Sequence, residues 1–159
     1  MIVAFANDHS GFALRQELMV MLTDFGVELV DHGTSTPERV DFPDLARLVC
    51  ASVLQGRADR GIMLCGTGIG AAIGANKFPG IRACVCHDVH SAHQGVEHDN
   101  MNVLCLGAKI IGAWLARDIL GAFLSAEFST DAYFRQRDQK LVQLENELFK
   151  RGSEGRDTT

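Results

Sequence analysis

Residues 61–77 read GIMLCGTGIGAAIGANK, and both the fold and the chemistry depend on this stretch. The apolar run 62–64 is typical of a buried strand, and the residues after the glycines favour a helix. Between them lie Cys65 and a glycine-rich turn, residues 66–70. A strand, a glycine turn and a helix in this order direct backbone N–H groups toward an anion or a developing oxyanion. A thiol beside them ionises more easily, because a helix N-terminus favours negative charge.

Short apolar runs alternate with segments of helical periodicity along the rest of the chain. We expect five strands, at residues 2–6, 27–30, 62–64, 81–86 and 101–106. We expect helices at residues 11–25, 43–55, 87–97, 112–124 and 132–150, and one more between the glycine turn and the Pro-Gly pair at 79–80. Short, almost continuously apolar strands that alternate with helices are typical of a parallel sheet covered on both faces. The predicted fold class is therefore α/β, with one five-stranded parallel sheet.

Length and composition are those of one globular domain. The 159 residues are 47% hydrophobic and 22% charged, and the net charge is −5, so nothing indicates a basic nucleic-acid surface or a polybasic membrane anchor. The apolar N-terminal run is too short for a signal peptide or a membrane span. We therefore assign residues 1–151 to a single domain and expect the polar residues 152–159 to form a flexible tail.

The chain contains five cysteines, an odd number, and most lie inside apolar runs. This usage is typical of reduced thiols in a cytoplasmic protein and not of a disulfide framework. Cys65 differs from the others because it stands at a strand end before a glycine turn, which favours chemistry over a structural role. The other four are expected to be buried structural cysteines: Cys50, Cys84, Cys86 and Cys105.

Polar side chains follow the first and third predicted strands. In open parallel sheets a ligand binds outside the carboxyl ends of the strands, where the strand order switches. Asp8 and His9 follow the first strand, and Cys65 and Thr67 follow the third. Proton transfer next to a carbonyl needs one base and one stabiliser of the resulting oxyanion. A thiolate and the amides of the loop supply both, so this chemistry requires no metal and no cofactor.

Other interpretations use some of the same residues. A glycine loop after a strand also suits a dinucleotide, but here it follows the third strand and begins with a thiol, which fits that ligand poorly. His87, His90 and His93 are spaced three apart and, with Asp88, could form a metal cluster. Such spacings arise often by accident on a solvated helix face, so we predict no metal site.

Five motifs occur in the order in which a known enzyme family carries them. They are Asp8-His9-x-Gly11, Arg39-x-Asp41-x-Pro43, the Cys65 loop, Ala75-Asn76-Lys77 with the following Pro-Gly-Ile-Arg-Ala, and His98 with Asn102-Val103-Leu104. In these residues the chain resembles the ribose-5-phosphate isomerase B family, which also includes galactose-6-phosphate and allose-6-phosphate isomerases. The similarity covers roughly residues 1–150.

The resemblance implies a metal-free aldose–ketose isomerase with a Rossmann-like three-layer sandwich fold. It implies a homodimer, in some members a tetramer, whose active sites are shared between subunits, with the C-terminal helix at the dimer interface. The first expected reaction is D-ribose 5-phosphate to D-ribulose 5-phosphate through an enediolate. Allose-6-, galactose-6- and erythrulose-4-phosphate remain alternative substrates, and a non-catalytic sugar-phosphate-binding module is the alternative function.

The resemblance also implies roles for single residues. Cys65 would be the base that moves a proton between C1 and C2, and Thr67 with the loop amides would stabilise the enediolate. His98 would assist ring opening. The implied substrate-binding residues, which contact ring oxygens, the loop-bound oxygens or the phosphate, are Asp8, His9, Gly66, Gly68, Gly70, Asp99, Asn100, Lys109 and Arg137.

This chain departs from the family pattern at the residues that bind the substrate. Ala72 replaces a serine, and Asp99 replaces the asparagine that usually follows the catalytic histidine. Lys109 replaces a phosphate-binding arginine. The departures leave the proton-transfer residues intact and leave the choice of sugar phosphate open. The candidates for holding the phosphate are Lys109, Tyr133, Arg135 and Arg137.

Overall fold

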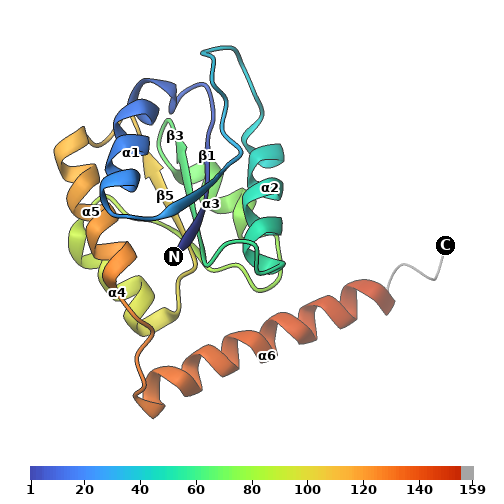
Figure 1. Ribbon diagram of the computed structural model, residues 1–159. Helices are drawn as coiled ribbons and strands as arrows, with labels where there is room; N and C mark the ends of the chain where they lie inside the picture. The colour runs from blue at the N-terminus through green and yellow to red at the C-terminus, as the bar shows by residue number, and fades with distance from the viewer. Residues whose placement is uncertain (155–159) are drawn as a thin grey trace.

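The computed structural model describes the backbone of residues 1–154 and the side chains of residues 1–148. Its centre is a five-stranded parallel sheet with the strand order β2-β1-β3-β5-β4 (Figure 1). The strands are β1 (Ile2–Asn7), β2 (Glu28–Asp31), β3 (Arg60–Cys65), β4 (Ala83–Val85) and β5 (Val103–Gly107). This arrangement confirms the predicted α/β class and the five parallel strands.

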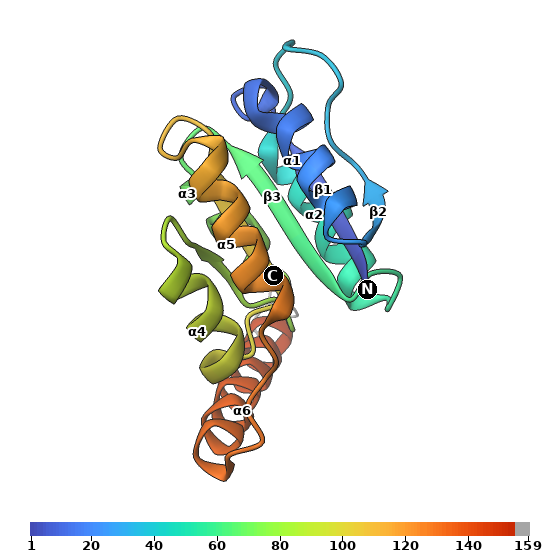
Figure 2. The same cartoon turned by 60° about the vertical axis from the view of Figure 1, so that its left-hand side comes forward.

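Helices cover both faces of the sheet (Figure 2). One layer contains α1 (Phe12–Asp24), α4 (Val89–Asp99) and α5 (Ala113–Ser125), and the opposite layer contains α2 (Phe42–Leu54) and α3 (Ile69–Ala75). The result is the three-layer sandwich that the resemblance implied. Within residues 1–154, no helix combines the length and the apolar character that a bilayer-spanning segment needs.

Two hydrophobic cores explain why the strands are nearly continuous apolar runs. Successive side chains of a strand point to opposite faces of the sheet. In β3, Ile62 and Leu64 pack into the core under α1 and α5, whereas Met63 and Cys65 pack into the core under α2 and α3. Both faces are buried, so every position of β3 after Arg60 is an apolar residue or glycine. The same alternation places the Cys65 side chain on the α2 and α3 side of the sheet.

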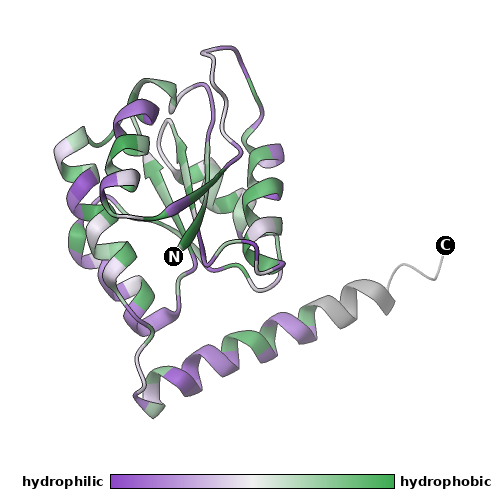
Figure 3. Cartoon of the chain, in the orientation of Figure 1, coloured by the Kyte–Doolittle hydropathy of each residue, from purple (hydrophilic) through white to green (hydrophobic). Residues whose placement is uncertain are grey.

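The C-terminal helix α6 (Ala132–Glu154) extends away from the sandwich as a long arm (Figure 1). Asp138 lies 3.5 Å from the Arg82 guanidinium, and the Glu145 carboxylate accepts a hydrogen bond from the Gly80 N–H at 2.9 Å. Apolar residues recur along the arm (Figure 3), and Leu141 and Leu144 are about half exposed, at 48% and 53%. Among the side chains that the structure describes, Leu141 and Leu144 therefore belong to neither core of the sandwich.

The structure corrects several predicted boundaries. The last helix continues to Glu154, so it includes residues 152–154 of the predicted tail, and residues 155–159 lie outside the described part of the chain. The division into a domain and a tail therefore stays a prediction. The fourth strand is only Ala83–Val85, because the Arg82 N–H donates to the Asn102 side chain. Cys84 is exposed on this edge strand, so its predicted burial was wrong.

Candidate active site

Cys65 ends strand β3 at the carboxyl edge of the sheet, where it lies in register with Gly107 of β5. The side chain is largely buried, and its Sγ accepts a hydrogen bond from the Gly68 N–H at 3.0 Å. A backbone N–H that donates to sulfur stabilises negative charge there. Thr67 is exposed at the same turn, and its hydroxyl accepts the Ile69 N–H at 3.4 Å. The predicted base thus lies beside the predicted oxyanion loop.

The turn has this shape because Gly68 adopts a left-handed conformation with φ of +79°. A methyl carbon placed on Gly68 would also come within 3.3 Å of the Cys105 carbonyl oxygen, so only glycine fits there. Gly70 has a different constraint, because a methyl carbon there would lie 3.1 Å from the ring of Phe42 in α2. Gly70 therefore has a packing role, and its predicted contact with substrate stays a prediction.

The loop after β1 lies next to the Cys65 loop. The Asp8 N–H donates to the Leu64 carbonyl at 3.1 Å, and the Asp8 carboxylate accepts the Gly11 N–H at 2.9 Å. His9 follows, and its Nδ1 is buried without a hydrogen-bond partner among the residues whose side chains are described. Buried polar atoms are normally paired, so a partner from a ligand or water is expected at this nitrogen.

Lys109 joins the same group from the end of β5. Its backbone N–H donates to the Gly66 carbonyl at 3.0 Å, and its side chain is exposed. The carboxyl edge thus brings together most of the predicted site residues, which we call the thiol half: Asp8, His9, Cys65, Gly66, Thr67, Gly68, Gly70 and Lys109.

The remaining site residues lie at the end of α4 and on α6, and we call this group the histidine half: His98, Asp99, Asn100 and Arg137. The His98 ring stacks on Phe134 with centroids 4.0 Å apart. The Asp99 carboxylate lies 3.6 Å from the Arg137 guanidinium. Asn100 ends α4 in a left-handed conformation, with φ of +54°. These contacts of Phe134 and Arg137 attach the first two turns of α6 to the end of α4.

The two halves lie at opposite edges of the sheet within one chain. Helix α4 starts after β4 at the carboxyl edge and returns along the sheet for 11 residues, about 16 Å. Its last turn, with His98, therefore lies at the amino edge, just before β5 begins at Val103. Val103 is in register with Gly61 and not with Cys65. One chain by itself does not bring His98 and Cys65 together.

The other buried cysteines differ from Cys65 in their surroundings. Burial raises the pKa of the Cys50 thiol to about 11 and that of the Cys86 thiol to about 12. Burial also raises the pKa of Cys105 well above the ordinary thiol value. These three side chains are therefore protonated at neutral pH, and a protonated thiol is a poor base.

The three histidines of the possible metal cluster do not converge. His87 Nε2 accepts the Gly107 N–H at 3.0 Å, and His93 Nε2 lies 3.4 Å from the Glu97 carboxylate. Among the described residues, no group of three His, Cys, Asp or Glu side chains is arranged to hold a metal ion. His87 nevertheless follows β4 at the carboxyl edge. The rule that selected Asp8 and Cys65 also selects His87, although its spacing in the sequence had suggested only a metal ligand.

The other phosphate candidates differ in their availability. The Arg135 guanidinium donates to the carbonyls of Ser129 and Phe128, at 2.6 and 3.0 Å, so it is occupied in holding the segment before α6. Tyr133 is 61% exposed, and the Arg137 guanidinium lies over its ring. Arg137 is half exposed and has only the solvated Asp99 as an ion-pair partner in the described part of the chain. Arg137 is therefore the arginine of this group that is easiest to direct toward a ligand.

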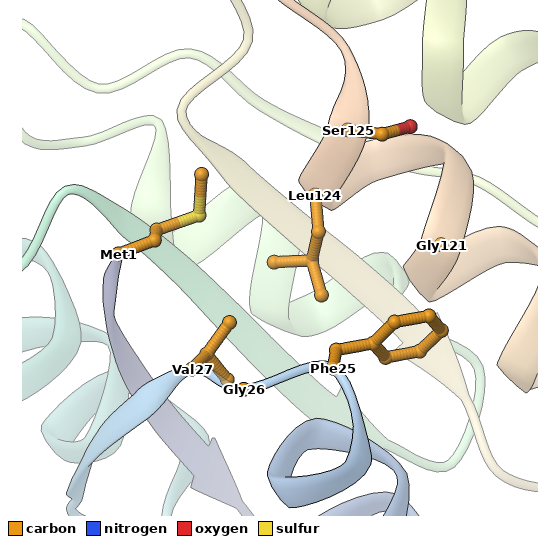
Figure 4. A pocket seen from close by; sticks show the side chains of 7 residues that line it. All are labelled: Met1, Phe25, Gly26, Val27, Gly121, Leu124 and Ser125. Atoms are coloured by element: carbon orange, nitrogen blue, oxygen red, sulfur yellow. The ribbon is translucent and has the colours of Figure 1, made fainter.

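A hollow of about 350 Å³ lies elsewhere on the molecule (Figure 4). It is lined mainly by apolar groups and by none of the predicted site residues: Met1, Phe25, Gly26, Val27, Gly121, Leu124 and Ser125. It offers no acid, base or cation for catalysis, so the candidate site stays with the two halves described above.

Comparisons with known proteins identify similar sequences and similar structures. Residues 3–141 match a family model described as Ribose/Galactose Isomerase. Ribose-5-phosphate isomerase B of Escherichia coli (strain K12) is 41% identical over 143 residues, which are 90% of this chain and 95% of that protein. D-erythrulose-4-phosphate isomerase of Pectobacterium atrosepticum is 40% identical over 127 residues, 79% of this chain and 84% of that protein. The solved structure of Clostridium thermocellum ribose-5-phosphate isomerase B superimposes with a TM-score of 0.89 at 40% identity, covering 93% of this chain and 99% of that one.

Proposed function

This chain belongs to the ribose/galactose isomerase family, and on that premise we propose that it interconverts an aldose phosphate and a ketose phosphate. The proposed reaction is D-ribose 5-phosphate to D-ribulose 5-phosphate. The observation that carries the proposal is the Cys65 thiol held by the Gly68 N–H inside the glycine loop. The relatives named for ribose 5-phosphate and for erythrulose 4-phosphate both support a sugar phosphate as the substrate class.

The geometry supports a proton-transfer mechanism that uses protein groups alone. The Cys65 thiolate removes the proton from C2 of the open-chain aldose, and the electron pair moves onto the carbonyl oxygen. The enediolate that forms carries negative charge, which backbone N–H groups and the Thr67 hydroxyl stabilise. Cys65 returns the proton to C1, and the proton of the C2 hydroxyl moves to the oxygen on C1 as the ketone forms at C2. His98 assists the opening of the sugar ring before these steps.

We further propose that the active site is completed by a second copy of the chain. Within one chain, the thiol half and the histidine half lie at opposite edges of the sheet. A symmetric dimer can place the thiol half of each chain against the histidine half of its partner. Ile69 and Ile73 of α3 are 56% and 57% exposed, and Leu148 of α6 is 58% exposed. Exposed apolar side chains beside the thiol half and along the arm are the surfaces that such a dimer would bury.

A substrate panel tests the proposed reaction. The purified protein is assayed with ribose, allose and galactose phosphates and with erythrulose 4-phosphate, by following formation of the isomer. We expect the highest kcat/KM with ribose 5-phosphate and no increase in melting temperature with NAD. Turnover is expected to survive exhaustive dialysis against EDTA, because the mechanism uses no metal.

Each outcome of the panel has a defined meaning. A higher kcat/KM with another sugar phosphate would change the substrate and keep the reaction class. Ligand-induced stabilisation without turnover would favour the non-catalytic binding module. Loss of activity in EDTA, restored by a divalent ion, would require a metal-dependent mechanism.

We also propose a cytoplasmic location, because the five cysteines are free and a reducing compartment maintains thiols.

Arg137→Ala is expected to raise KM about ten- to a hundredfold while kcat changes much less. A guanidinium can grip a phosphate with two charge-assisted hydrogen bonds, and a net loss of about 1.5–3 kcal/mol, the contribution of one such bond, corresponds to this change in KM. The phosphate does not react, so it is held equally in the ground state and the transition state, and such binding affects KM. Steady-state kinetics with ribose 5-phosphate measure the effect.

Arg117→Ala is the matched control, since Arg117 is a half-exposed arginine paired with Asp24 on the surface. An unchanged KM for Arg137→Ala would remove Arg137 from the phosphate site.

A further inference from the structure

His87 lies two residues beyond the end of strand β4. The strand stops at Val85, and the chain turns into α4, whose first residues are held by the Asp88 carboxylate through the Ser91 N–H at 2.7 Å. Strand β5 is longer at this edge and reaches Gly107. The Gly107 N–H donates to His87 Nε2 at 3.0 Å, so an imidazole nitrogen takes the place of a strand carbonyl. A nitrogen that accepts carries no proton, so the His87 proton lies on Nδ1.

The two residues that follow Gly107 donate hydrogen bonds to the glycine loop that begins at Cys65. The Ala108 N–H donates to the Cys65 carbonyl at 2.8 Å, and the Lys109 N–H donates to the Gly66 carbonyl at 3.0 Å. All described peptide bonds are trans, and in a trans peptide the C=O and the N–H point in opposite directions. Fixing these two carbonyls therefore points the N–H groups of Gly66 and Thr67 away from β5.

Packing at Gly107 leaves no free space between His87 and the loop. A methyl carbon placed on Gly107 would lie 2.8 Å from the Thr67 carbonyl carbon and 2.9 Å from His87 Nε2. The imidazole, the Gly107 backbone and the Thr67 backbone are therefore in direct contact. Moving the imidazole or removing its acceptor atom changes the position of Gly107, and Gly107 leads directly into the two residues that hold the loop carbonyls.

We propose that His87 is a positioning residue for the isomerisation. Its Nε2 anchors the Gly107 N–H, Gly107 sets the position of Ala108 and Lys109, and these orient the Gly66 and Thr67 N–H groups toward the developing oxyanion. His87 acts through the loop and not on the substrate. The inference rests on the proposed function, because it assigns His87 a part in stabilising the enediolate.

Two substitutions at position 87 test the anchor. His87→Leu keeps a similar volume but removes the acceptor, and His87→Gln places a side-chain oxygen near the position of Nε2. We expect the leucine variant to lose about ten- to a hundredfold in kcat with KM within about twofold, because misplaced oxyanion donors affect the transition state. The glutamine variant should keep kcat within about threefold. His90→Leu is the matched control on the exposed side of α4 and should behave as the wild type.

Nuclear magnetic resonance of the wild-type protein supplies a readout that does not depend on turnover. Long-range 15N–1H correlation should show His87 protonated on Nδ1, and the Gly107 amide should exchange with solvent faster in the leucine variant than in the glutamine variant. If the leucine variant does not fold, His87→Asn serves instead, since its side chain is too short to reach the Gly107 N–H, and the same kcat loss is expected.

The outcomes separate this inference from the proposed function. Wild-type protein that is inactive on every sugar phosphate overturns the proposed function, and the inference that depends on it, while the tautomer measurement still reports the anchor. Active wild type with unchanged kcat in the leucine variant overturns the inference alone. Equal kcat losses in the leucine and glutamine variants also overturn it, because the acceptor atom would then not be the cause.

Discussion

Cys65→Ala is expected to lower kcat by about 10³-fold or more, because the substitution removes the base that transfers the proton. The other four thiols lie outside the thiol half, and burial raises the pKa values of three of them, Cys50, Cys86 and Cys105. The Cys65 side chain is packed at the end of β3 and loses one sulfur atom, so the fold and the substrate affinity should be retained. Steady-state kinetics, together with deuterium exchange from solvent into C2 of the bound sugar, measure the loss of proton transfer.

Cys84→Ala provides the control for this experiment. Cys84 is exposed on β4 and lies outside the thiol half, so its removal should leave kcat unchanged. Iodoacetamide should inactivate the wild type by alkylating Cys65, and ribose 5-phosphate should protect the enzyme. Substantial activity in Cys65→Ala, or inactivation that follows modification of Cys84, would remove Cys65 from the mechanism.

Mixing Cys65→Ala with His98→Asn should restore activity that neither variant has alone. Each substitution lies in a different half of the site, and within one chain the two halves lie at opposite edges of the sheet. If the site is shared between two copies, a mixed dimer has one site with both lesions and one with neither. With random exchange about half of the dimers are mixed, so activity should reach about a quarter of the wild-type value.

The control for mixing places both lesions in the same half. Cys65→Ala mixed with Cys65→Ser has no intact thiol half in any dimer and should stay inactive. Native mass spectrometry of differently tagged chains establishes that subunits exchange. Exchange without recovery would mean that His98 serves the chain that carries it, and a His98→Asn variant that is fully active by itself would mean that His98 has no part in turnover. Either result would contradict the shared active site.

Local patterns were sufficient to predict much of this molecule. The predicted five strands and six helices are all present, and most of their boundaries lie within two residues of the observed ones. The apolar runs identify the strands because both faces of a parallel sheet are buried. Asp8, Cys65 and Thr67 were placed correctly at one edge, because the carboxyl ends of parallel strands coincide and β1 lies beside β3.

Where prediction was incomplete, the cause lies in contacts between distant segments. β4 is shorter than predicted because Asn102, twenty residues away, takes the Arg82 N–H. Cys84 is exposed because the strand order leaves β4 at the edge of the sheet. For the last helix, only the resemblance predicted a dimer interface; the position of α6 beyond the sandwich and the half-exposed Leu141 and Leu144 support that expectation, which stays a proposal.

Neighbouring residues alone are sufficient to predict the fold class and the position of the thiol and its glycine loop, because they specify a strand, a turn and a helix. The position of His98 at the opposite edge of the sheet from Cys65 becomes visible only in the folded chain. The 11-residue α4 carries His98 back to the amino edge, and the turn after β4 places His87 against Gly107. A distance across the sheet depends on strand order and helix direction, which no local pattern of residues contains.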